Sequence, residues 1–359
     1  MRNRITMIRL EHMNDTNITI LQLFRGSKTL ASSDVHQELS GGASLVTVKR
    51  ALSELHAQGF LEREGAGRSV RYRISRRGVL LRPYDTAVYL QEPQENRMAS
   101  TQFNHALFQG SYEPVMNDVA MQRLDAATKT YQEKARQNEA VHTRELQRFM
   151  VEMSWKSARI EGNTYTLLDT EKLLTYGIVS PKNTPFETQM LLNQKAAFDF
   201  VWETQDMWER PSILYIEKLH ESIIDQLGVA RNLRSTTVGI TGTDYEPLGN
   251  GFQIREALEQ LLRYIQQAAN AYEKALLLTV GMSYIQPFAD GNKRTARMTA
   301  NALLLANGLA PISYRSVDET AYKEALLIFY EQNSVVPFRE LFVEQYEYSA
   351  THYNIARPA

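Results

Sequence analysis

The chain has 359 residues, of which 43% are hydrophobic and 23% charged, the balance of an ordinary soluble globular protein with two or three domains. It contains no cysteine, which excludes a disulfide framework, a thiolate nucleophile and a thiolate zinc site, and its seven histidines show no HExxH-type spacing. No run approaches the roughly 20 apolar residues of a membrane span and the first residues lack a signal-peptide core, so we expect a cytoplasmic protein without membrane contact.

The formal net charge of -1 conceals an uneven distribution. Residues 1–80 hold 13 Lys/Arg against 7 Asp/Glu, a net charge of +6, which leaves -7 for the remainder. A basic N-terminal head on an acidic body suggests that only the head contacts a polyanion.

Three short helices are predicted in this head. Apolar residues at helical spacing indicate the first over residues 17–25, and Ser32 and Ser33 are candidate caps for a second that runs through residue 39. The third follows a turn at residues 41–42 and has Ser44 as its N-cap and Gly59 at its end. Its apolar face is formed by Leu45, Val48, Leu52 and Leu55.

A basic hairpin is predicted next, in the stretch FLEREGAGRSVRYRIS, where Val70, Tyr72 and Ile74 alternate with polar residues and GAG supplies the turn. Three helices and a basic hairpin resemble the winged helix-turn-helix of bacterial transcription regulators, over about residues 15–78. The resemblance implies that the third helix enters the major groove of DNA and that the hairpin, the wing, contacts phosphates. The residues it places against DNA are Ser44, Thr47, Lys49 and Arg50 on the helix and Arg63, Arg68, Arg71 and Arg73 on the wing. A head that docks another protein, with a solvated basic face, is the alternative.

Residues 81–114 lose this periodicity and read as an ordered linker with at most one strand. From about Val119 to Gly162 the sequence is helical again. The first half of that stretch carries dense surface charge, which is typical of a spacer and equally of a binding element.

The most informative stretch is YIQPFADGNKRTAR, residues 284–297. Pro287 must end the apolar helix that precedes it, and a new helix is predicted over about residues 292–307. The DGN turn between them places backbone N–H groups at a helix N-terminus, where they and the helix dipole form an anion site. A Mg²⁺-nucleotide needs a carboxylate for the metal, a nest of backbone N–H groups for one phosphate and two arginines for the other phosphates.

QPFADGNKRTAR also resembles the signature of the Fic/Doc (Fido) family, H-P-F-x-[DE]-G-N-[GK]-R-x-x-R, at every defined position except the first. Members typically transfer AMP from ATP to a protein hydroxyl, and some transfer phosphate or another phosphate-linked group. The resemblance implies that Asp290 binds Mg²⁺ and that Phe288 anchors the loop in the core. Lys293 occupies a position that is lysine in the Doc-like branch, which is associated with phosphorylation. The phosphate-binding residues that it implies are Gly291 and Asn292 as the anion nest, together with Arg294 and Arg297.

Two other segments support this resemblance. Residues 233–249 read as a hairpin and match the family's flap, whose edge pairs with the backbone of a protein target. The flap residues implied here are Val238, Ile240, Gly242 and Tyr245. SARIEGN, residues 157–163, resembles the family's inhibitory motif [ST]-x-x-x-E-[GN], which implies inhibitory roles for Ser157 and Glu161. Glu161 would pair with Arg297 and block productive placement of the γ-phosphate of ATP.

The departure from the signature is Gln286, which stands where the family has its catalytic histidine. A glutamine amide has no accessible basic state, so loss of general-base assistance should raise the transfer barrier by about 3 to 5 kcal/mol. Nucleotide binding need not fall with it. His220 lies on an apolar-periodic helix and is expected to be packed rather than to replace the base. Natural loss and deliberate substitution of the histidine would both leave this sequence.

The expected fold is mainly α, with an all-helical Fido core, a β-hairpin flap and an α+β winged helix-turn-helix. The expected domains are residues 1–80 for the winged helix, 81–114 for a linker, 115–350 for the Fido core with an inhibitory helix near 145–162, and 351–359 for a tail. Together with Gln286 and the basic head, the resemblance predicts a DNA-binding regulator that binds ATP and Mg²⁺ and has lost or much reduced AMP-transferase activity, and a homodimer is consistent with paired half-sites on DNA. The alternatives are an active adenylyltransferase or Doc-like phosphotransferase that Glu161 inhibits, and an adaptor with a protein-docking head.

Overall fold

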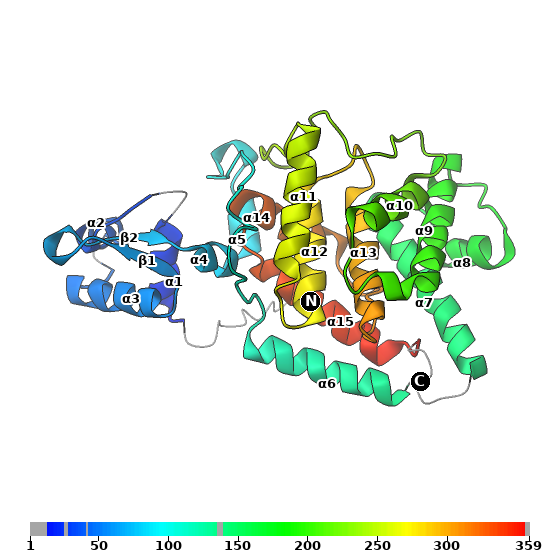
Figure 1. Cartoon of the computed structure of the whole chain (residues 1–359), viewed down its shortest axis with the longest axis horizontal. Helices are drawn as coiled ribbons and strands as arrows, with labels where there is room; N and C mark the ends of the chain where they lie inside the picture. Colours follow the sequence, from blue (N-terminus) through cyan, green and yellow to red (C-terminus); the bar gives the residue numbers. More distant parts are fainter. Residues whose placement is uncertain (1–12, 25–27, 41, 135–138, 356–359) are drawn as a thin grey trace.

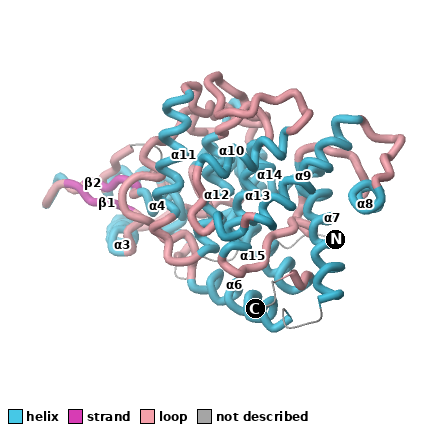
Figure 2. The backbone as a smooth tube through the Cα atoms, turned by 45° about the vertical axis from the view of Figure 1, so that its right-hand side comes forward, coloured by secondary structure: helices cyan, strands magenta, loops and turns pink. Residues whose placement is uncertain are grey.

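The computed structural model describes residues 13–24, 28–40, 42–134 and 139–355. A small head, residues 13–74, stands to one side of a large helical body, residues 118–355, and a connector, residues 75–117, joins them (Figure 1). Within the described ranges the only sheet has two strands, both in the head (Figure 2). The predicted mainly helical class is confirmed. Residues 1–12 of the predicted head, Gly41 of the predicted turn, Arg25 and the end of the predicted tail lie outside the described residues.

The head contains the predicted helices, α1 (Asp15–Leu23), α2 (Ser32–Glu38) and α3 (Leu45–Ala57). Ser44 caps α3 as predicted, since its side chain accepts a hydrogen bond from the backbone N–H of Thr47. The predicted cap of α2 was wrong by one residue: the N-cap is Ala31, whose N–H donates to the Asp34 carboxylate at 2.9 Å. Leu45 was wrongly assigned to the buried face, because it lies at the exposed first turn of α3 and is 37% exposed.

The predicted hairpin follows α3. Strand β1 (Leu61–Glu64) pairs antiparallel with β2 (Arg71–Ile74), and a 3₁₀ turn, η1 (Gly67–Ser69), lies in the connection. Tyr72 and Ile74 are half-buried while Arg71 and Arg73 are exposed, so the predicted alternation is confirmed. An isolated bridge from Leu30 to Tyr72 ties the hairpin to the start of α2.

The connector is more structured than the sequence indicated. It contains α4 (Arg76–Leu81), α5 (Thr86–Gln91) and η2 (Gln94–Asn96), and in place of a strand it has an isolated bridge from Gln102 to Glu246. Ser75 and Asp85 cap the two α-helices by accepting hydrogen bonds from the N–H groups of Gly78 and Val88. These helices are only six residues long, too short to show the periodicity that identifies longer ones.

The body is built of helices. The stretch predicted as helical from residue 119 to 162 contains α6 and α7, and residues 135–138 between them lie outside the described part. The helices and their bounds are α6 (Asp118–Lys134), α7 (Glu139–Ile160), α8 (Leu167–Tyr176), α9 (Pro185–Glu203), η3 (Gln205–Met207), α10 (Ile213–Ile224), α11 (Gly251–Ile265), α12 (Ala271–Ile285), α13 (Asn292–Ala306), α14 (Glu319–Gln332) and α15 (Val336–His352).

Helix α12 is the centre of the body, with α11 and α13 beside it (Figure 1). All of its residues except Lys274 are buried, the pattern of a helix surrounded by others. It ends as predicted, with Gln286 in the left-handed conformation (φ 49°) immediately before Pro287. Because α12 and α13 are held by the core, the loop between them, residues 286–291, is fixed at both ends. Within the described ranges, none of the helices combines the length and apolar character needed to cross a bilayer.

Candidate functional site

The loop between α12 and α13 is locked by its own side chains. The Phe288 N–H donates to Asn292 Oδ1 and Asn292 Nδ2 donates to the Phe288 carbonyl, both at 2.8 Å. Phe288 is fully buried and stacks on the ring of His220, with centroids 3.6 Å apart. The Asn292 amide is therefore held in place by two hydrogen bonds within the loop, and its backbone N–H belongs to the first turn of α13.

Gly291 gives the loop its shape. It is the N-cap of α13 with φ 80°, and a Cβ atom there would lie 3.0 Å from Ile224. A residue with a side chain would be strained by the left-handed backbone and also crowded by α10. Gly291 supplies no side-chain cap, so the first N–H groups of α13 remain directed at whatever lies in front of the helix.

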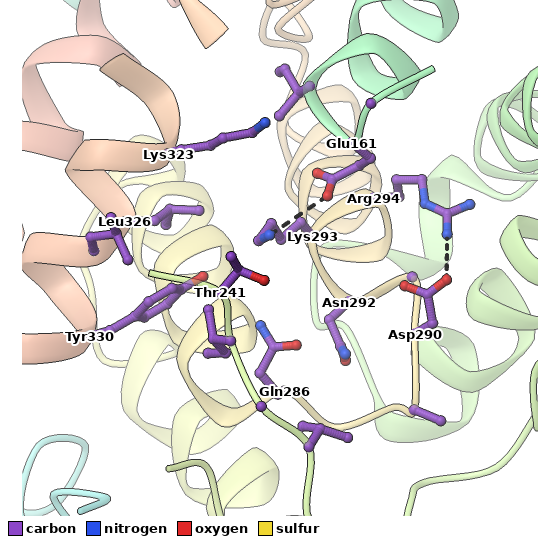
Figure 3. A pocket seen from close by; sticks show the side chains of 18 residues that line it. Glu161, Thr241, Gln286, Asp290, Asn292, Lys293, Arg294, Lys323, Leu326 and Tyr330 are labelled. Carbon is purple, nitrogen blue, oxygen red and sulfur yellow. Dashed lines mark hydrogen bonds and ion pairs between the residues drawn. The ribbon is translucent and has the colours of Figure 1, made fainter. Parts of the chain in front are cut away.

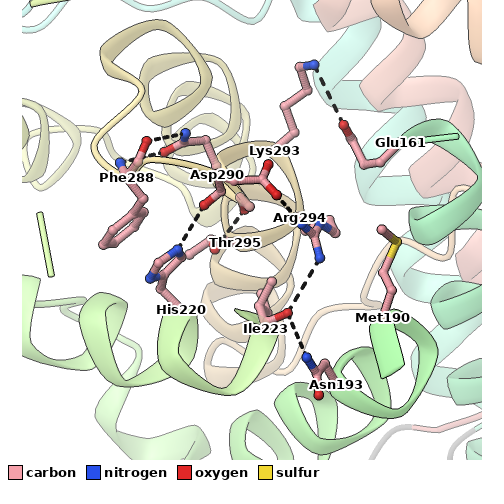
Figure 4. A network of polar contacts seen from close by, with 12 residues as sticks. Glu161, Met190, Asn193, His220, Ile223, Phe288, Asp290, Lys293, Arg294 and Thr295 are labelled. Atoms are coloured by element: carbon pink, nitrogen blue, oxygen red, sulfur yellow. Dashed lines mark hydrogen bonds and ion pairs between the residues drawn. The ribbon is translucent and has the colours of Figure 1, made fainter. Parts of the chain in front are cut away.

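His220 of α10 supports the same loop from below (Figure 4). Its Nε2 lies 2.9 Å from the carbonyl oxygen of Asp290, and its Nδ1 lies 3.3 Å from that of Arg231. Burial lowers its pKa, which favours the neutral ring with one N–H, and we assign that hydrogen to the shorter contact with Asp290. The predicted packed role is confirmed by its complete burial, but its contact with the loop was not foreseen.

Asp290 and Arg294 form an ion pair one turn apart at the edge of the loop. Arg294 Nη2 lies 3.1 Å from Asp290 Oδ2, and the arginine side chain is only 2% exposed while the carboxylate is 58% exposed. Burial lowers the pKa of Arg294, and the charge of Asp290 opposes that shift. The arginine is thus held rigidly in the protein and its partner carboxylate faces outward.

A cavity of about 550 Å³ opens in front of this loop (Figure 3). It collects residues from four parts of the chain: the end of α7, residues 238–241, the loop with the first turn of α13, and one face of α14. The lining residues are Ile160, Glu161, Gly162, Val238, Gly239, Ile240, Thr241, Gln286, Ala289, Asp290, Gly291, Asn292, Lys293, Arg294, Lys323, Leu326, Leu327 and Tyr330. The sequence did not indicate the α14 wall, because Lys323, Leu326, Leu327 and Tyr330 have the spacing of any helix face.

Arg297, which the resemblance assigned to phosphate binding, does not line this cavity. Its Nη1 lies 2.9 Å from Glu161 Oε1, its Nε donates to Ser157 Oγ at 3.1 Å and its Nη2 donates to the Ser157 carbonyl at 2.8 Å. Tyr322 lies against the same group, with its hydroxyl 3.3 Å from Nη1 and its ring 5.3 Å from the guanidinium, and the ring of Tyr314 lies 6.0 Å away. Ser157, Glu161 and Arg297 therefore meet as one cluster, which two tyrosine rings border.

Glu161 is the carboxylate at the centre of this cluster. Burial alone would raise its pKa, but the charges of Arg297 and Lys293 outweigh burial and lower it. Lys293 Nζ lies 3.6 Å from Glu161 Oε2, on the cavity side. Glu161 is therefore ionised at neutral pH and neutralises one buried and one half-buried cation.

Gln286 lies at the inner end of the cavity and is 8% exposed. Its Nε2 donates to the Ser283 carbonyl at 2.7 Å, which leaves the amide oxygen and the second amide hydrogen for other partners (Figure 3). This oxygen accepts hydrogen bonds but cannot hold a proton near neutral pH. His105 and His142 are not among the residues that line the cavity.

The segment predicted as a hairpin flap forms one wall of the cavity but differs in structure from the prediction. A turn lies at Thr241–Gly242, yet no strand is assigned between residues 233 and 249. The two limbs are joined instead by the buried Arg234, whose Nη1 donates to the carbonyls of Thr236 and Leu248, each at 2.5 Å. Tyr245 is also withdrawn, since it is 1% exposed and its hydroxyl donates to the Tyr284 carbonyl at 3.0 Å. The second limb is thus held by the Arg234 side chain and by the body rather than by backbone hydrogen bonds to the first limb.

Of the predicted flap residues, Val238 and Ile240 line the cavity. Gly242 lies at the turn above Leu327, and Tyr245 is part of the core.

The cavity suits a metal ion only when a bound ligand supplies part of the coordination of that ion. Among the described residues, no three His, Asp or Glu side chains gather closely enough to hold a metal. Asp290 offers an exposed carboxylate at the rim, which is a hard oxygen donor of the kind that Mg²⁺ uses together with phosphate oxygens. The residues present therefore fit Mg²⁺ that a phosphate ligand shares with the protein.

The predicted DNA-contacting residues gather on the surface of the head but differ in their charge environment. Ser44, Lys49, Arg50, Arg63, Arg68, Arg71 and Arg73 are exposed, and Thr47 is half-buried. Arg73 lies 2.6 Å from Glu62 and 3.1 Å from Glu64, and Arg71 lies 3.5 Å from Asp34. Acidic neighbours thus offset part of the positive charge of the wing.

The central part of this chain is similar in sequence to proteins of one family. The family model described as Fic/DOC family matches residues 210–304, which include α10, α12, the loop and most of α13. "Protein adenylyltransferase Fic" from Nematostella vectensis is 30% identical over 183 residues, 48% of this chain and 41% of that protein. "Protein adenylyltransferase fic-1" from Caenorhabditis elegans is 24% identical over 49% of this chain and 36% of that protein. The chain thus spans less than half the length of these relatives.

Solved structures show the same fold. A fragment of Fic-1 from C. elegans superimposes with a TM-score of 0.54 at 19% identity and covers 66% of this chain and 71% of the fragment. A Fic domain containing signaling protein from Bacteroides thetaiotaomicron gives a TM-score of 0.55 at 20% identity, over 64% of this chain and 94% of that chain.

Proposed function

We propose, from the premise that this chain belongs to the Fic/DOC family, that it is an ATP-binding regulator in which most of the transfer chemistry has been lost. One observation carries the proposal. The loop that would hold phosphates is complete and rigid, whereas Gln286 lies where the signature has its histidine. Binding and transfer are therefore separated in this chain.

Three features of the cavity favour a polyphosphate ligand. The uncapped N-terminus of α13 offers backbone N–H groups and the positive end of its dipole. Lys293, Arg294 and Lys323 line the same space. The volume of about 550 Å³ is within the usual range for nucleotide-sized ligands. The nucleotide phosphates would lie against α13, between its first turn and the cations.

Mg²⁺ would be held at Asp290 and, when bound, would neutralise part of the phosphate charge. The carboxylate of Asp290 is oriented by Arg294, which is itself buried and cannot follow a ligand outward. Asp290 can therefore exchange part of its contact with Arg294 for the metal without a rearrangement of the loop.

Glu161 is the proposed inhibitory residue. It occupies Nη1 of Arg297 and also approaches Lys293, so two cations that could serve phosphates are neutralised by one carboxylate. Release of α7 from the cluster would return both charges to the cavity. In this proposal the γ-phosphate of ATP competes with Glu161 for them.

Transfer of AMP to a protein hydroxyl needs a group that accepts the hydroxyl proton as the oxygen attacks the α-phosphorus and pyrophosphate leaves. Gln286 cannot accept it, and His220 has its Nε2 directed to the Asp290 carbonyl. A protein target would lie along residues 238–241, where the flap borders the cavity.

The head is the proposed DNA-binding part, a winged helix with α3 as the element that enters the major groove. Support comes from the exposed Lys49 and Arg50 on α3 and from Arg63 and Arg68 on the wing. A homodimer would place two such heads on paired half-sites. A cytoplasmic location would follow from this role.

An active transferase is the second candidate, because the relatives are named protein adenylyltransferase. Because Lys293 matches the lysine of the Doc-like branch, a phosphotransferase is a variant of this second candidate. Either activity would require a base supplied by the substrate or by water, and either would be restrained by Glu161.

Isothermal titration of the chain with ATP in the presence and absence of Mg²⁺ tests the binding proposal. We expect saturable heat with Mg²⁺, and about tenfold weaker binding for Asp290→Asn, the loss of one charge-assisted contact. The matched control is Glu171→Gln on α8, an exposed carboxylate outside the cavity, which should bind as the unchanged chain does. No heat at millimolar ATP would refute nucleotide binding, and absence of salt-dependent binding to duplex DNA would refute the role of the head.

A further inference from the structure

The connector contacts both the turn of the flap and the head. In its middle part, Arg97 Nη2 donates to the carbonyl of Gly242 at 2.6 Å and Gln94 Nε2 donates to Asp244 Oδ1 at 2.6 Å. The N–H of Glu246 also donates to the Thr101 carbonyl at 2.9 Å. The turn that closes one wall of the cavity is therefore held by the connector on its outer side.

The same segment is bound to the end of α14. Arg97 Nη1 lies 3.3 Å from Glu331 Oε1, and both side chains are buried, at 6% and 0% exposed. The Tyr89 hydroxyl donates to Glu331 Oε2 at 2.7 Å. Glu331 immediately follows Tyr330, which lines the cavity. The connector thus rests on the helix that forms the opposite cavity wall.

Arg82 extends these contacts to the head. Its Nη1 donates to the carbonyl of Phe24 at the end of α1 at 2.6 Å, and its Nη2 donates to Gln332 Oε1 at 3.2 Å. Gln332 Oε1 also accepts a hydrogen bond from the Tyr84 hydroxyl at 2.7 Å, and Gln332 Nε2 donates to the Met98 carbonyl at 2.8 Å. Arg82 is 4% exposed, so its two contacts cannot move independently.

From these contacts we propose that the connector transmits the position of the flap turn and α14 to the head, with the buried Arg97–Glu331 pair as its central contact. A ligand that draws residues 238–241 inward pulls on Gly242, and Arg97 passes that displacement to α5 and to Arg82. Coupling is reciprocal, so a ligand of the head changes the affinity of the cavity by the same factor. As a route by which nucleotide reaches DNA binding, this inference rests on the proposed function.

A buried ion pair suits such a contact. Removal of one partner leaves an uncompensated charge, whereas replacement of both by apolar residues of similar size is often neutral for stability. The pair therefore holds the connector in one arrangement, and the double replacement can remove the link while the fold remains.

Hydrogen exchange of the full chain without any ligand tests the link directly. In Arg97→Met we expect at least threefold faster exchange in peptides that cover residues 237–246 and also in those that cover α1. Arg97→Met/Glu331→Leu should give the same pattern with a native far-ultraviolet spectrum, which guards against general loss of structure. Arg255→Met, which removes an exposed ion pair to Glu217, is the control and should leave both regions unchanged. Faster exchange in the flap with unaltered exchange in α1, in either variant, would overturn the proposal.

A second arm adds ATP and Mg²⁺ to the unchanged chain. We expect at least threefold slower exchange in the flap and in α1, and in the double variant a response in the flap alone. If titration gives no heat with ATP, the proposed function fails, and the ligand-free arm still decides whether the link exists. If ATP binds and protects the flap but α1 responds equally in both proteins, the link through Arg97 is refuted.

Discussion

At the scale of single residues, the cavity depends on how a few charges are shared. Glu161 serves Arg297 and Lys293, and Asp290 serves Arg294, so every carboxylate among the cavity-lining residues is paired with a cation. Most of these residues could be predicted because they lie in one contiguous motif. The contact of Glu161 with Arg297 spans 136 positions and was named only through the family resemblance.

The lowered pKa of Glu161 has a consequence for stability. A carboxyl whose pKa is lower in the folded chain than in the unfolded chain stabilises the fold above its ordinary pKa, and this contribution is lost as pH falls through the folded value. We expect Glu161→Gln to lower the free energy of unfolding by about 2 kcal/mol at pH 7, because the buried Arg297 loses a charged partner.

Urea unfolding of both proteins between pH 7 and pH 3 measures this difference. It should be constant near neutrality and shrink once the pH falls below about 4, the ordinary carboxyl pKa. A difference that does not change down to pH 3 would show that the charge of Glu161 does not stabilise the fold.

At the scale of elements, the loop between α12 and α13 is rigid before any ligand binds. Pro287, the Phe288–Asn292 hydrogen bonds and Gly291 set its conformation, and His220 supports it from α10. The sequence predicted the helix end, the turn and the following helix, because proline and glycine act locally. It could not predict the support from His220 or the wall from α14, because both depend on tertiary packing.

Replacement of Gly291 by alanine tests the rigidity of the loop. Gly177, at the end of α8, has a similar φ of 70° but nothing within 4 Å of its would-be Cβ, whereas that of Gly291 would lie 3.0 Å from Ile224. Gly177→Ala should therefore cost only the left-handed backbone, about 1 kcal/mol, and Gly291→Ala about 1 to 3 kcal/mol more. Thermal unfolding measures both. Equal losses would show that α10 does not crowd the loop.

The wing makes a second prediction at this scale. Arg73 is paired with Glu62 and Glu64, whereas Arg68 is exposed near the hairpin turn. A cation that already has an acidic partner gives up part of its interaction with that partner when it binds a phosphate. We expect Arg68→Ala to weaken DNA binding and to reduce the salt dependence by about one phosphate contact, and Arg73→Ala to have the smaller effect. Fluorescence anisotropy over a series of salt concentrations measures both effects. A larger effect for Arg73→Ala than for Arg68→Ala would contradict this explanation of the wing.

At the scale of the whole molecule, the mainly helical class could be predicted because long amphipathic helices and capping residues mark themselves in the sequence. The flap was predicted as a hairpin from its turn residues and the family resemblance, but Arg234 and Tyr245 attach its second limb to the body. The connector was predicted as a linker because its helices are too short to show a period, although it contacts head, flap and α14. Long-range contacts of this kind leave no local pattern.

In the function proposed above, the cavity binds ATP, Glu161 restrains it and Gln286 prevents efficient transfer. Removal of the restraint alone should therefore not produce transfer. Restoration of the base should be worth about 10² to 10⁴ in rate. Only the combination of the two changes should approach the activity that the names of the relatives describe.

Intact-mass spectrometry after incubation with ATP and Mg²⁺ is the most direct test. It compares the unchanged chain with Glu161→Gly, Gln286→His and the double variant. The chain is the only protein in the mixture, so a mass gain of one AMP unit reports transfer to a hydroxyl of the chain itself. We predict this gain in the double variant, a smaller one in Gln286→His, and none in the unchanged chain or in Glu161→Gly. Addition of AMP or phosphate to a chain that retains Gln286 would contradict the account and establish an active transferase.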